Sequence, residues 1–354
     1  LTAFAPPAEN LPPVHPSEAA DVARVRAYRA GALRIVRGDI HRHTDLSWDG
    51  NRDGSLDDSY RYAMDAAGFD FLGVCDHQAG ESIAYNWWRI QKAADLYSIP
   101  GRFAPVYSYE RSLSWPNGHR NVFFALRGRP ILEIPAAESR GAEGAARLYA
   151  YLRRFAGVTT SHTSASGMGT DWRDSDAELE PVVEIYQGYR SNFETPGAPR
   201  APSRKESAKF DAGFVWKAWA KGIKMGVQSS SDHVSTHISY AGFYVDRVDR
   251  DAIVAAMKAR RAYAATDNIF VELRMGEHLM GEAFAASAPP PLTAFVSGTA
   301  PIKQVDVIKS NRIVYTAPGT GREMRFTYTD REPPSGEAWY YIRAEQENGE
   351  LAWS

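Results

Sequence analysis

The sequence predicts an α/β protein, with a parallel β/α domain followed by a small all-β module. From about residue 34 to residue 267, strand-like apolar runs alternate with helix-like segments, which is typical of a parallel β/α domain that at this length can close into a barrel. After residue 267, strand-like runs follow one another without helices, as in a small antiparallel sheet or sandwich. Seven of the nine histidines stand near the point where an apolar run ends, with acidic residues beside them. We therefore expect an N-terminal strap and helix over 1–33, a β/α barrel over 34–267 and an all-β module over 268–354.

Size, composition and charge limit the class of protein and its partners. At 354 residues and 39.2 kDa the chain holds one large domain and a small one. Hydrophobic residues make up 44%, which excludes the disordered class. A net charge of −2 and a pI near 6.6 give no global field for nucleic acid or an acidic membrane. The apolar runs fall short of the ~20 residues of a membrane span, so neither partner is expected.

The ends of the sequence and its single cysteine add two expectations. The chain starts at Leu1 without a methionine or a signal-like stretch, and its last segment, AWS, stops within a strand-like pattern. We expect a trimmed product that continues past Ser354, and an extracytoplasmic location agrees with that start and with the lack of thiol dependence. Cys75, alone in an apolar run, excludes an internal disulfide and a thiolate zinc site, and is expected to be an inert core thiol.

The first elements follow from proline, glycine and apolar patterning. Residues 1–16 are proline-rich and are expected to form an extended strap, with His15 as a bystander between prolines. A helix is predicted over about 17–31, ending at Gly31. The run IVRGDIH at 35–41 predicts the first strand of the β/α series.

The series continues with a helix that has clear start and stop signals. Ser55 is placed to cap this helix and Gly68 to end it. The run FDFLGVCD at 69–76 is almost continuously apolar, as in a strand buried in a parallel sheet. The elements expected beyond it are helices near 81–97, 143–155, 211–221 and 249–260, and strands at 103–110, 121–126, 157–162, 181–188, 224–232 and 241–245.

The C-terminal module is predicted from strand-like runs that turn residues separate. Proline and glycine clusters at 289–291, 318–321 and 333–336 are expected to form turns. The strands expected between them are 270–275, 292–298, 302–309, 312–317, 324–329 and 338–346.

Metal-type side chains stand at or just beyond the ends of the predicted strands of the β/α series. His41 and His43 are two apart on a strand, so both rings point to the same face, and Asp49 follows in a turn. A carboxylate or imidazole at the end of a buried strand must be paired, bound to a metal or held neutral. For each residue alone a local hydrogen bond is the better interpretation, but the set together predicts a cluster of divalent metal ions. The further members of the set are His77, Glu110, His119, His162, Asp232 and His233, with His237 one short loop further on.

The order of these motifs resembles that of a known family. HRHT, SWDG, CDH, YE, GH, SH and SDH, in this order, resemble the PHP (polymerase and histidinol phosphatase) family of metal-dependent phosphoesterases. The resemblance covers about residues 35–265, with Cys75 in place of the usual threonine. It implies a distorted seven-stranded β/α barrel, (β/α)7, that holds two or three divalent metal ions. The ligands it implies are His41, His43, Asp49, His77, Glu110, His119, His162 and Asp232.

The last motif departs from the family pattern. The family places a histidine two residues after its final aspartate, where this chain has Val234. Either His233 or His237 is the ninth ligand; we favour His233, with His237 as the alternative or as a substrate contact. The all-β module is not part of the basic family and indicates a subfamily.

The ligand set indicates the chemistry. Carboxylate and imidazole ligands together suit Zn²⁺, Mn²⁺ or Fe²⁺. Three dications bring six positive charges against three negative charges from Asp49, Glu110 and Asp232, so the site favours an anion such as a phosphate ester. We expect a small-molecule anionic substrate, hydrolysed by a metal-bridging hydroxide. Candidates to protonate the leaving group are His233 and His237.

Arginines and tryptophans near the motifs are candidate substrate contacts. Four arginines can hold phosphate oxygens or, equally, form salt bridges, and we assign one of them, Arg120, to the substrate; the four are Arg42, Arg111, Arg120 and Arg190. Trp48 and Trp115 occupy polar turn sequences and are candidates to stack on a substrate ring.

Two other functions remain open at this point. The same metals can hydrolyse an ester, amide or carbohydrate linkage, because an activated hydroxide is not selective for phosphorus. Alternatively, the barrel binds metal or ligand without catalysis. The sequence contains no G-x-S-x-G elbow, P-loop or G-x-G-x-x-G motif that would favour another enzyme class.

Overall fold

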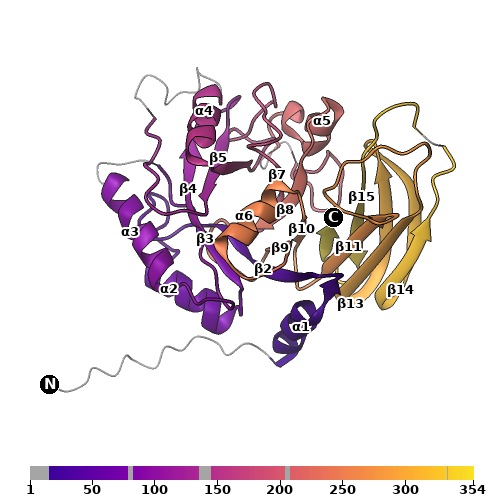
Figure 1. The fold of residues 1–354 in the computed structure, drawn as a ribbon, viewed down its shortest axis with the longest axis horizontal. Helices are drawn as coiled ribbons and strands as arrows, with labels where there is room; N and C mark the ends of the chain where they lie inside the picture. Colours follow the sequence, from indigo (N-terminus) through magenta and orange to yellow (C-terminus); the bar gives the residue numbers. More distant parts are fainter. Residues whose placement is uncertain (1–15, 79–82, 135–144, 204–207, 333) are drawn as a thin grey trace.

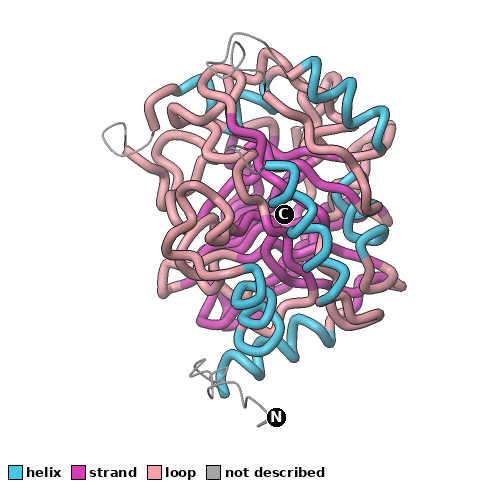
Figure 2. Tube along the Cα trace, turned by 90° about the vertical axis from the view of Figure 1, so that its left-hand side faces the viewer, coloured by secondary structure: helices cyan, strands magenta, loops and turns pink. Residues whose placement is uncertain are grey.

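The protein is α/β, as predicted, and rich in sheet. The computed structural model describes residues 16–78, 83–134, 145–203, 208–332 and 334–354. The strap expected at 1–15, with His15, lies outside the described residues. The long C-terminal strands gather at the right of Figure 1, and the helices and shorter strands of the first part lie to their left. Turned by 90°, the strands occupy the middle of the molecule, with several helices along one side and many loops on the other (Figure 2).

The helices lie mainly in the first part of the chain. Those described are α1 (Pro16–Ala27), α2 (Leu56–Arg61), η1 (Tyr62–Ala66), α3 (Ile83–Leu96), α4 (Ala146–Phe155), η2 (Asp211–Gly213), α5 (Val215–Ala220) and α6 (Arg250–Lys258).

The strands of the first part are short, and those near the C-terminus include two long ones. Those described are β1 (Arg29–Ala30), β2 (Leu33–Arg42), β3 (Phe71–Val74), β4 (Tyr107–Ser112), β5 (His119–Phe124), β6 (Val158–Ser161), β7 (Val182–Gln187), β8 (Gly226–Ser230), β9 (Tyr240–Val245), β10 (Ala262–Ala265), β11 (Phe270–Met275), β12 (His278–Leu279), β13 (Leu292–Lys309), β14 (Arg312–Tyr328), β15 (Tyr340–Gln346) and β16 (Leu351–Trp353).

The strand ends that carry the metal-type residues are joined by pairings. β2 pairs with β3 in parallel, and parallel bridges at Gly73–Val106 and His77–Glu110 join β3 to β4. β4, β5 and β6 form an antiparallel sheet, and β7 pairs with β8 in parallel. A parallel bridge from Arg42 to Asp232 connects the end of β2 to the residues that follow β8. The pairings therefore run in the order β7-β8-β2-β3-β4-β5-β6.

The expected parallel alternation is correct for part of this series and wrong for the rest. Residues 113–118, which connect β4 to β5, form no helix, so β5 returns antiparallel beside β4. A parallel neighbour would need a crossover of a dozen or more residues. The α/β class is confirmed, but fewer strands are parallel than the sequence predicts.

The C-terminal strands share one sheet with the first part of the chain. The last strand, β16, pairs with β10 on one side and with β15 on the other, in the order β1-β2-β9-β10-β16-β15-β13-β11-β12. One hydrophobic cluster accordingly combines Ile35 and Tyr244 with Val296 and Ile342. Sheet and core thus connect the two parts.

Capping residues predict the ends of α2 and η1 correctly, whereas proline and glycine do not predict the ends of the long strands. Ser55 forms a capping box with Asp58, and Gly68 takes a positive φ of 58° just after η1. The helix expected to end at Gly31 ends earlier, at Ala27. The turn expected at 318–321 is wrong, because β14 runs through it. Register shifts between Ser297 and Gln304 let β13 continue past Pro301, so two predicted strands merge.

Two further expectations concern burial. Cys75 is fully buried, its thiol donates to the Ile40 carbonyl, and burial raises the pKa of the thiol, as expected for a core cysteine. Within the described ranges, the helices are all too short or too polar to cross a bilayer.

Candidate metal centre

One carboxylate, that of Glu110, lies at the centre of the site and is almost completely buried. His43 Nε2 and His162 Nε2 each lie 3.1 Å from its oxygens, and His41 Nε2 and His77 Nδ1 each lie 3.5 Å away. His119 Nδ1 contacts Oε1 of the same carboxylate. Five imidazoles from distant parts of the chain therefore surround a single acid.

The strand ends explain how these rings meet. His41 lies on β2, and His43 is the first residue after this strand. Because side chains alternate along an extended chain, both rings point to the same face. Glu110 lies on β4 opposite His77 in the bridge that extends β3. His119 begins β5, which pairs with β4, and His162 follows β6, which pairs with β5. Each ring thus reaches Glu110 from the end of a strand that its neighbours hold in place.

A second carboxylate, that of Asp232, also faces His41 and His43. Its Oδ1 lies 3.0 Å from His43 Nε2 and 3.3 Å from His41 Nε2. Asp232 and Val234 have positive φ angles of 70° and 69°, which are unfavourable for these residues, above all for a β-branched one. This backbone turns His233 inward, so that its Nε2 lies 3.5 Å from Asp232 Oδ1. The histidine adjacent to the aspartate, rather than one two residues on, therefore joins the site.

Asp49 provides the third carboxylate of the site. Its Oδ2 lies 2.8 Å from His77 Nε2 and 3.7 Å from His233 Nε2, and its Oδ1 lies 3.7 Å from His43 Nδ1. Ser47 donates a hydrogen bond of 2.7 Å to the same carboxylate. The turn after β2 therefore brings Asp49 back over the strand end, as the sequence predicts.

Five triads in this cluster bring ligand atoms within 4.8 Å of one another. All nine predicted metal residues belong to a triad, with Glu184 as a tenth member. The triads are His41–His43–Glu110, His41–His162–Glu184, His43–Asp232–His233, His43–Asp49–His77 and His77–Glu110–His119.

The donor atoms fit divalent cations. Nε2 of His41 and Nε2 of His43 are buried and have no hydrogen-bond partner, although both face carboxylate oxygens. A buried polar atom without a partner is costly, and a cation between imidazole and carboxylate would satisfy both. Nitrogen and oxygen donors without thiolates suit Zn²⁺, Mn²⁺ or Fe²⁺.

The electrostatics of the site point the same way. Burial opposes a charge on His43, but the adjacent carboxylates of Asp232 and Glu110 favour the protonated ring and raise its pKa to about 10. Burial also opposes ionisation of Asp49, yet the hydrogen bond and charge of His77 lower the pKa of that carboxyl to about 2. The pKa of Glu110 is well below its usual range despite burial, because of His77 and His162. The site therefore favours positive charge between its carboxylates.

Two acids that the sequence analysis did not select hold ligand rings in place. Glu184 Oε2 lies 2.9 Å from His41 Nδ1, and Asp53 Oδ2 lies 2.7 Å from His233 Nδ1. A carboxylate on the far nitrogen fixes the tautomer and leaves Nε2 for a metal. Glu184 had a signal in the sequence, since it interrupts the apolar run VVEIY. Asp53, in a polar turn, had none.

Two predicted catalytic residues lie elsewhere. His237 Nδ1 faces Glu18 at 4.0 Å, the ring lies edge-on to Tyr62, and no metal triad within the described ranges includes it. Arg120 is buried, with its Nε 3.4 Å from Glu180, and also donates to the Asn117 and Asp174 carbonyls. His237 and Arg120 are therefore not members of the histidine–carboxylate cluster.

Exposed aromatic side chains border the cluster. Trp48 is 71% exposed and its ring stacks on His77, with centroids 5.2 Å apart. Tyr189, also exposed, lies edge-on to His233 at 5.1 Å, and the exposed Arg190 lies over the Tyr189 ring. A small cavity of about 240 Å³ is lined by Arg42, Asp53, Asp58, Ser59, Tyr62, Val234 and Thr236, of which Asp53 also pairs with His233.

Fold and site together define an α/β protein with a buried, many-membered histidine–carboxylate cluster at its strand ends. Among curated proteins, similar chains occur in three chlamydiae, each described only as an uncharacterized protein. The chain is 25% identical to that of Chlamydia muridarum over 64% of its own length, 25% to that of Chlamydia trachomatis over 55%, and 24% to that of Chlamydia pneumoniae over 55%. The matches span 43%, 37% and 36% of these relatives, so the chain covers less than half of their length. No protein-family model matches the sequence.

Solved structures that align with this chain include a two-domain protein and two endonucleases. A two-domain protein of Bacteroides vulgatus, containing a predicted PHP-like metal-dependent phosphoesterase, aligns with a TM-score of 0.48 and 11% identity over 92% of this chain and 94% of that one. Endonuclease Q in complex with a 27-mer duplex substrate that has an abasic lesion at the active site aligns at 0.39, with 14% identity over 63% of this chain and 56% of that one. The lesion-specific endonuclease of Pyrococcus furiosus aligns at 0.37, with 12% identity and the same coverage.

Proposed function

We propose that the protein is a metal-dependent hydrolase that acts on phosphoric esters. One observation carries the proposal: five imidazoles converge on the buried Glu110 carboxylate, and two of them, His41 and His43, present Nε2 atoms that lack hydrogen bonds. These two atoms also face carboxylate oxygens of Glu110 and Asp232, which is the arrangement that a cation between imidazole and carboxylate requires. Two or three divalent ions between the rings and the acids account for the arrangement.

We assign the metal ligands as the sequence predicts them, with His233 in the place that the family gives to a residue one position later. We add Glu184 and Asp53 as the acids that orient His41 and His233. We also propose that β2 to β8 form the distorted (β/α)7 barrel, which the chain of pairings from β7 through β2 to β6 supports.

The charge balance makes the number of ions decisive for the substrate. With Glu184 the cluster holds four carboxylates, so two dications would give a neutral site, whereas three would leave a charge of +2. An anionic substrate is favoured in the second case. We therefore propose three ions, of the kinds Zn²⁺, Mn²⁺ or Fe²⁺, and a small anionic substrate.

Such ions would supply Lewis acids for phosphoryl oxygens and lower the pKa of a water molecule. The protein supplies orientation: Asp53 and Glu184 accept from Nδ1 of His233 and His41, so each Nε2 faces the cluster. Of the four arginines near the motifs, Arg190 is the exposed one, beside Tyr189 and His233, and we assign it to the substrate anion. Arg120, held by Glu180, has a positioning role for β5 and His119. We assign no role at the reacting atoms to His237.

The test compares matched substrates that release the same chromophore. The metal-loaded protein should hydrolyse p-nitrophenyl phosphate or bis-p-nitrophenyl phosphate, and should leave p-nitrophenyl acetate and p-nitrophenyl glycosides near the background rate. The double variant His41→Ala/His43→Ala should lose bound metal and turnover together, because both rings face the same two carboxylates.

Hydrolysis of the acetate or a glycoside without hydrolysis of either phosphate would contradict the phosphoesterase assignment and keep the hydrolase. Full turnover by the double variant, or no metal in the purified wild-type protein by elemental analysis together with no turnover after metal addition, would contradict the hydrolase.

A further inference from the structure

A second cavity, of about 590 Å³, shares no residue with the metal cluster. It lies between the connection from α5 to β8, the end of α6, the β11–β12 hairpin with the segment after it, and the connection from β14 to β15. This volume is in the range of sites for small organic ligands.

The floor and one wall of the cavity are apolar. Leu273 and Leu279, both buried, line the floor together with Met275. Phe284 is 37% exposed but is held by His278, whose ring stacks on it at 3.8 Å and whose Nδ1 pairs with Glu282 at 2.9 Å. An aromatic side chain fixed in this way gives a ligand an apolar contact surface without further ordering.

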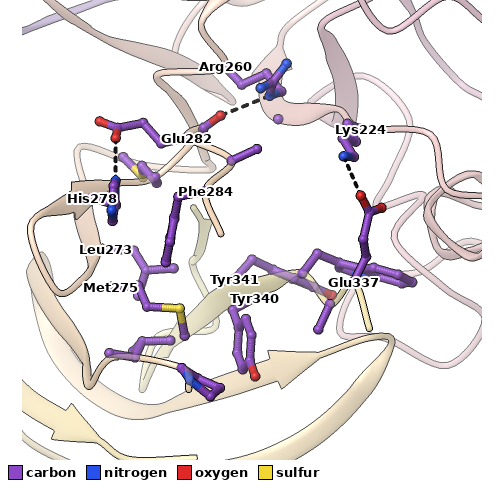
Figure 3. A pocket seen from close by; sticks show the side chains of 18 of the residues that line it. Lys224, Arg260, Leu273, Met275, His278, Glu282, Phe284, Glu337, Tyr340 and Tyr341 are labelled. Atoms are coloured by element: carbon purple, nitrogen blue, oxygen red, sulfur yellow. Dashed lines mark hydrogen bonds and ion pairs between the residues drawn. The ribbon is translucent and has the colours of Figure 1, made fainter. Parts of the chain in front are cut away.

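Two cationic side chains lie at the opposite end of the cavity. Figure 3 shows Arg260 and Lys224 at this end, away from Leu273 and Met275. Lys224 is already paired with Glu337 at 3.1 Å. Arg260 Nε donates to the Gly281 carbonyl at 3.0 Å, and within the described ranges no carboxylate pairs with its guanidinium.

The position of Arg260 is unfavourable in free energy, for two reasons. It is half-buried, and burial lowers the pKa of its guanidinium. Its φ of 56° follows the end of α6, at a position where glycine is the usual residue. A cation that is desolvated, unpaired and strained is expected to serve an anion from outside the chain.

We propose that this cavity binds an amphipathic organic anion, with its acidic group on Arg260 and its apolar body against Phe284, Leu273 and Met275. The site is independent of the metal cluster and of the hydrolase activity proposed for it. A charged group at one end and aromatic and aliphatic contacts at the other distinguish this ligand from a small polar anion such as phosphate.

Two fluorescent probes with the same ring system test the proposal. 1-Anilinonaphthalene-8-sulfonate carries an anion, and N-phenyl-1-naphthylamine lacks it. Both should bind the full, metal-loaded chain at one saturable site. Arg260→Gln should weaken the sulfonate about tenfold, as for loss of a charged hydrogen bond, and leave the neutral probe unchanged. The exposed Arg102→Gln, in the turn before β4, is the matched control and should change neither.

Further variants locate the site and protect the test against misfolding. Arg260→Lys keeps the cation and should retain most of the sulfonate affinity, so it carries the charge test if Arg260→Gln does not fold. Met275→Glu puts a like charge and a polar group in the apolar wall and should weaken both probes. Equal sulfonate affinity in the wild type and Arg260→Gln, unchanged binding in Met275→Glu, or no saturable binding to the wild type would each overturn the proposal.

Discussion

Two buried polar networks in this protein differ in how their charges are balanced. In the first, near the C-terminus, Arg343 donates to Glu194 at 2.9 Å and to Asp306 at 2.8 Å. Trp353 and Tyr341 also donate to Glu194. Every partner in this network is a side chain of the protein, so it needs nothing from outside.

The second network, the metal cluster, is balanced differently. The charged partners that Glu110 and Asp232 show are imidazoles, which carry a charge only when protonated. Nε2 of His41 and Nε2 of His43 are buried without a hydrogen bond. The comparison teaches that burial of charge does not itself mark a functional site. The metal cluster differs because its unpaired imidazole nitrogens face several carboxylates at once.

The largest difference between the networks should appear when the central acid of the cluster loses its charge. Glu110→Gln keeps the volume but removes the anion that five imidazoles face, so we expect loss of bound metal. Turnover should fall by more than about 100-fold, the upper range for acids that only support a ligand. Metal content by elemental analysis and initial rates measure both. Full metal content in this variant would contradict the central place of Glu110.

The same substitution in the other network should act on stability instead. Glu194→Gln leaves Arg343 buried with one acid, and we expect a loss of about 3 kcal/mol in the free energy of unfolding. Urea denaturation measures this, and metal content should stay at the wild-type level. The exposed Glu178→Gln is the control, expected within about 0.5 kcal/mol. A loss of metal in Glu194→Gln would show that the networks are not separate.

Removal of metal should also distinguish the two networks, by the response of their variants to a chelator. Ions that bind the folded state alone stabilise it by about 3 kcal/mol at 100 times the dissociation constant. A chelator should therefore lower the unfolding midpoint of the wild type and of Glu194→Gln by similar amounts. Glu110→Gln, already without metal, should not respond. A chelator effect of wild-type size in Glu110→Gln would contradict the location of the ions.

A smaller effect is expected at the acids that orient ligands. Asp53→Asn weakens the hold on His233 Nδ1, and loss of such a partner lowers metal affinity by about 10–100-fold. Only the ion next to His233 should be affected, so dialysis against a weak chelator should remove part of the metal. Complete loss, or none, would contradict the assignment of Asp53 to one corner of the cluster.

How much of this could be predicted from the sequence depends on the kind of signal. Predicted ligands such as His77 and Glu110 stand at the ends of apolar runs, where an ionisable side chain is costly unless it is paired or binds a metal. Glu184 was missed because it lies within a run, and a single acid there looks like a paired core residue. Whether His233 or His237 joins the cluster depends on the positive φ angles at Asp232 and Val234. Neither residue type predicts a positive φ.

The fold, too, could be predicted from the sequence only in part. The α/β class follows from the alternation of apolar runs, but strand direction depends on connections. The short turn before His119 makes β5 antiparallel, a pairing that apolar patterning cannot reveal. In the C-terminal strands, separate strands at 292–298 and 302–309 and a turn at 318–321 were predicted, yet register shifts in the β13–β14 pair let both strands continue.

The smallest expected effect lies at the rim of the cluster, where neither network is disturbed. Trp48 is 71% exposed and covers His77, so Trp48→Ala removes a stacking surface without opening the core. An aromatic pair contributes about 0.5–1.5 kcal/mol, which predicts a rise in KM of a few-fold for a substrate that carries a ring. The value of kcat should hardly change, because the ligands keep their partners.

The exposed Trp88 on α3 provides the matched control, since it packs on Tyr85 and not on a ligand ring. Trp88→Ala should leave KM unchanged for every substrate. For Trp48→Ala, the rise in KM should be present with p-nitrophenyl phosphate and absent with a small alkyl phosphate, because only the former has a ring to stack. An equal rise for both would place Trp48 in the support of His77 rather than in substrate binding, and the metal content of the variant would then fall as well.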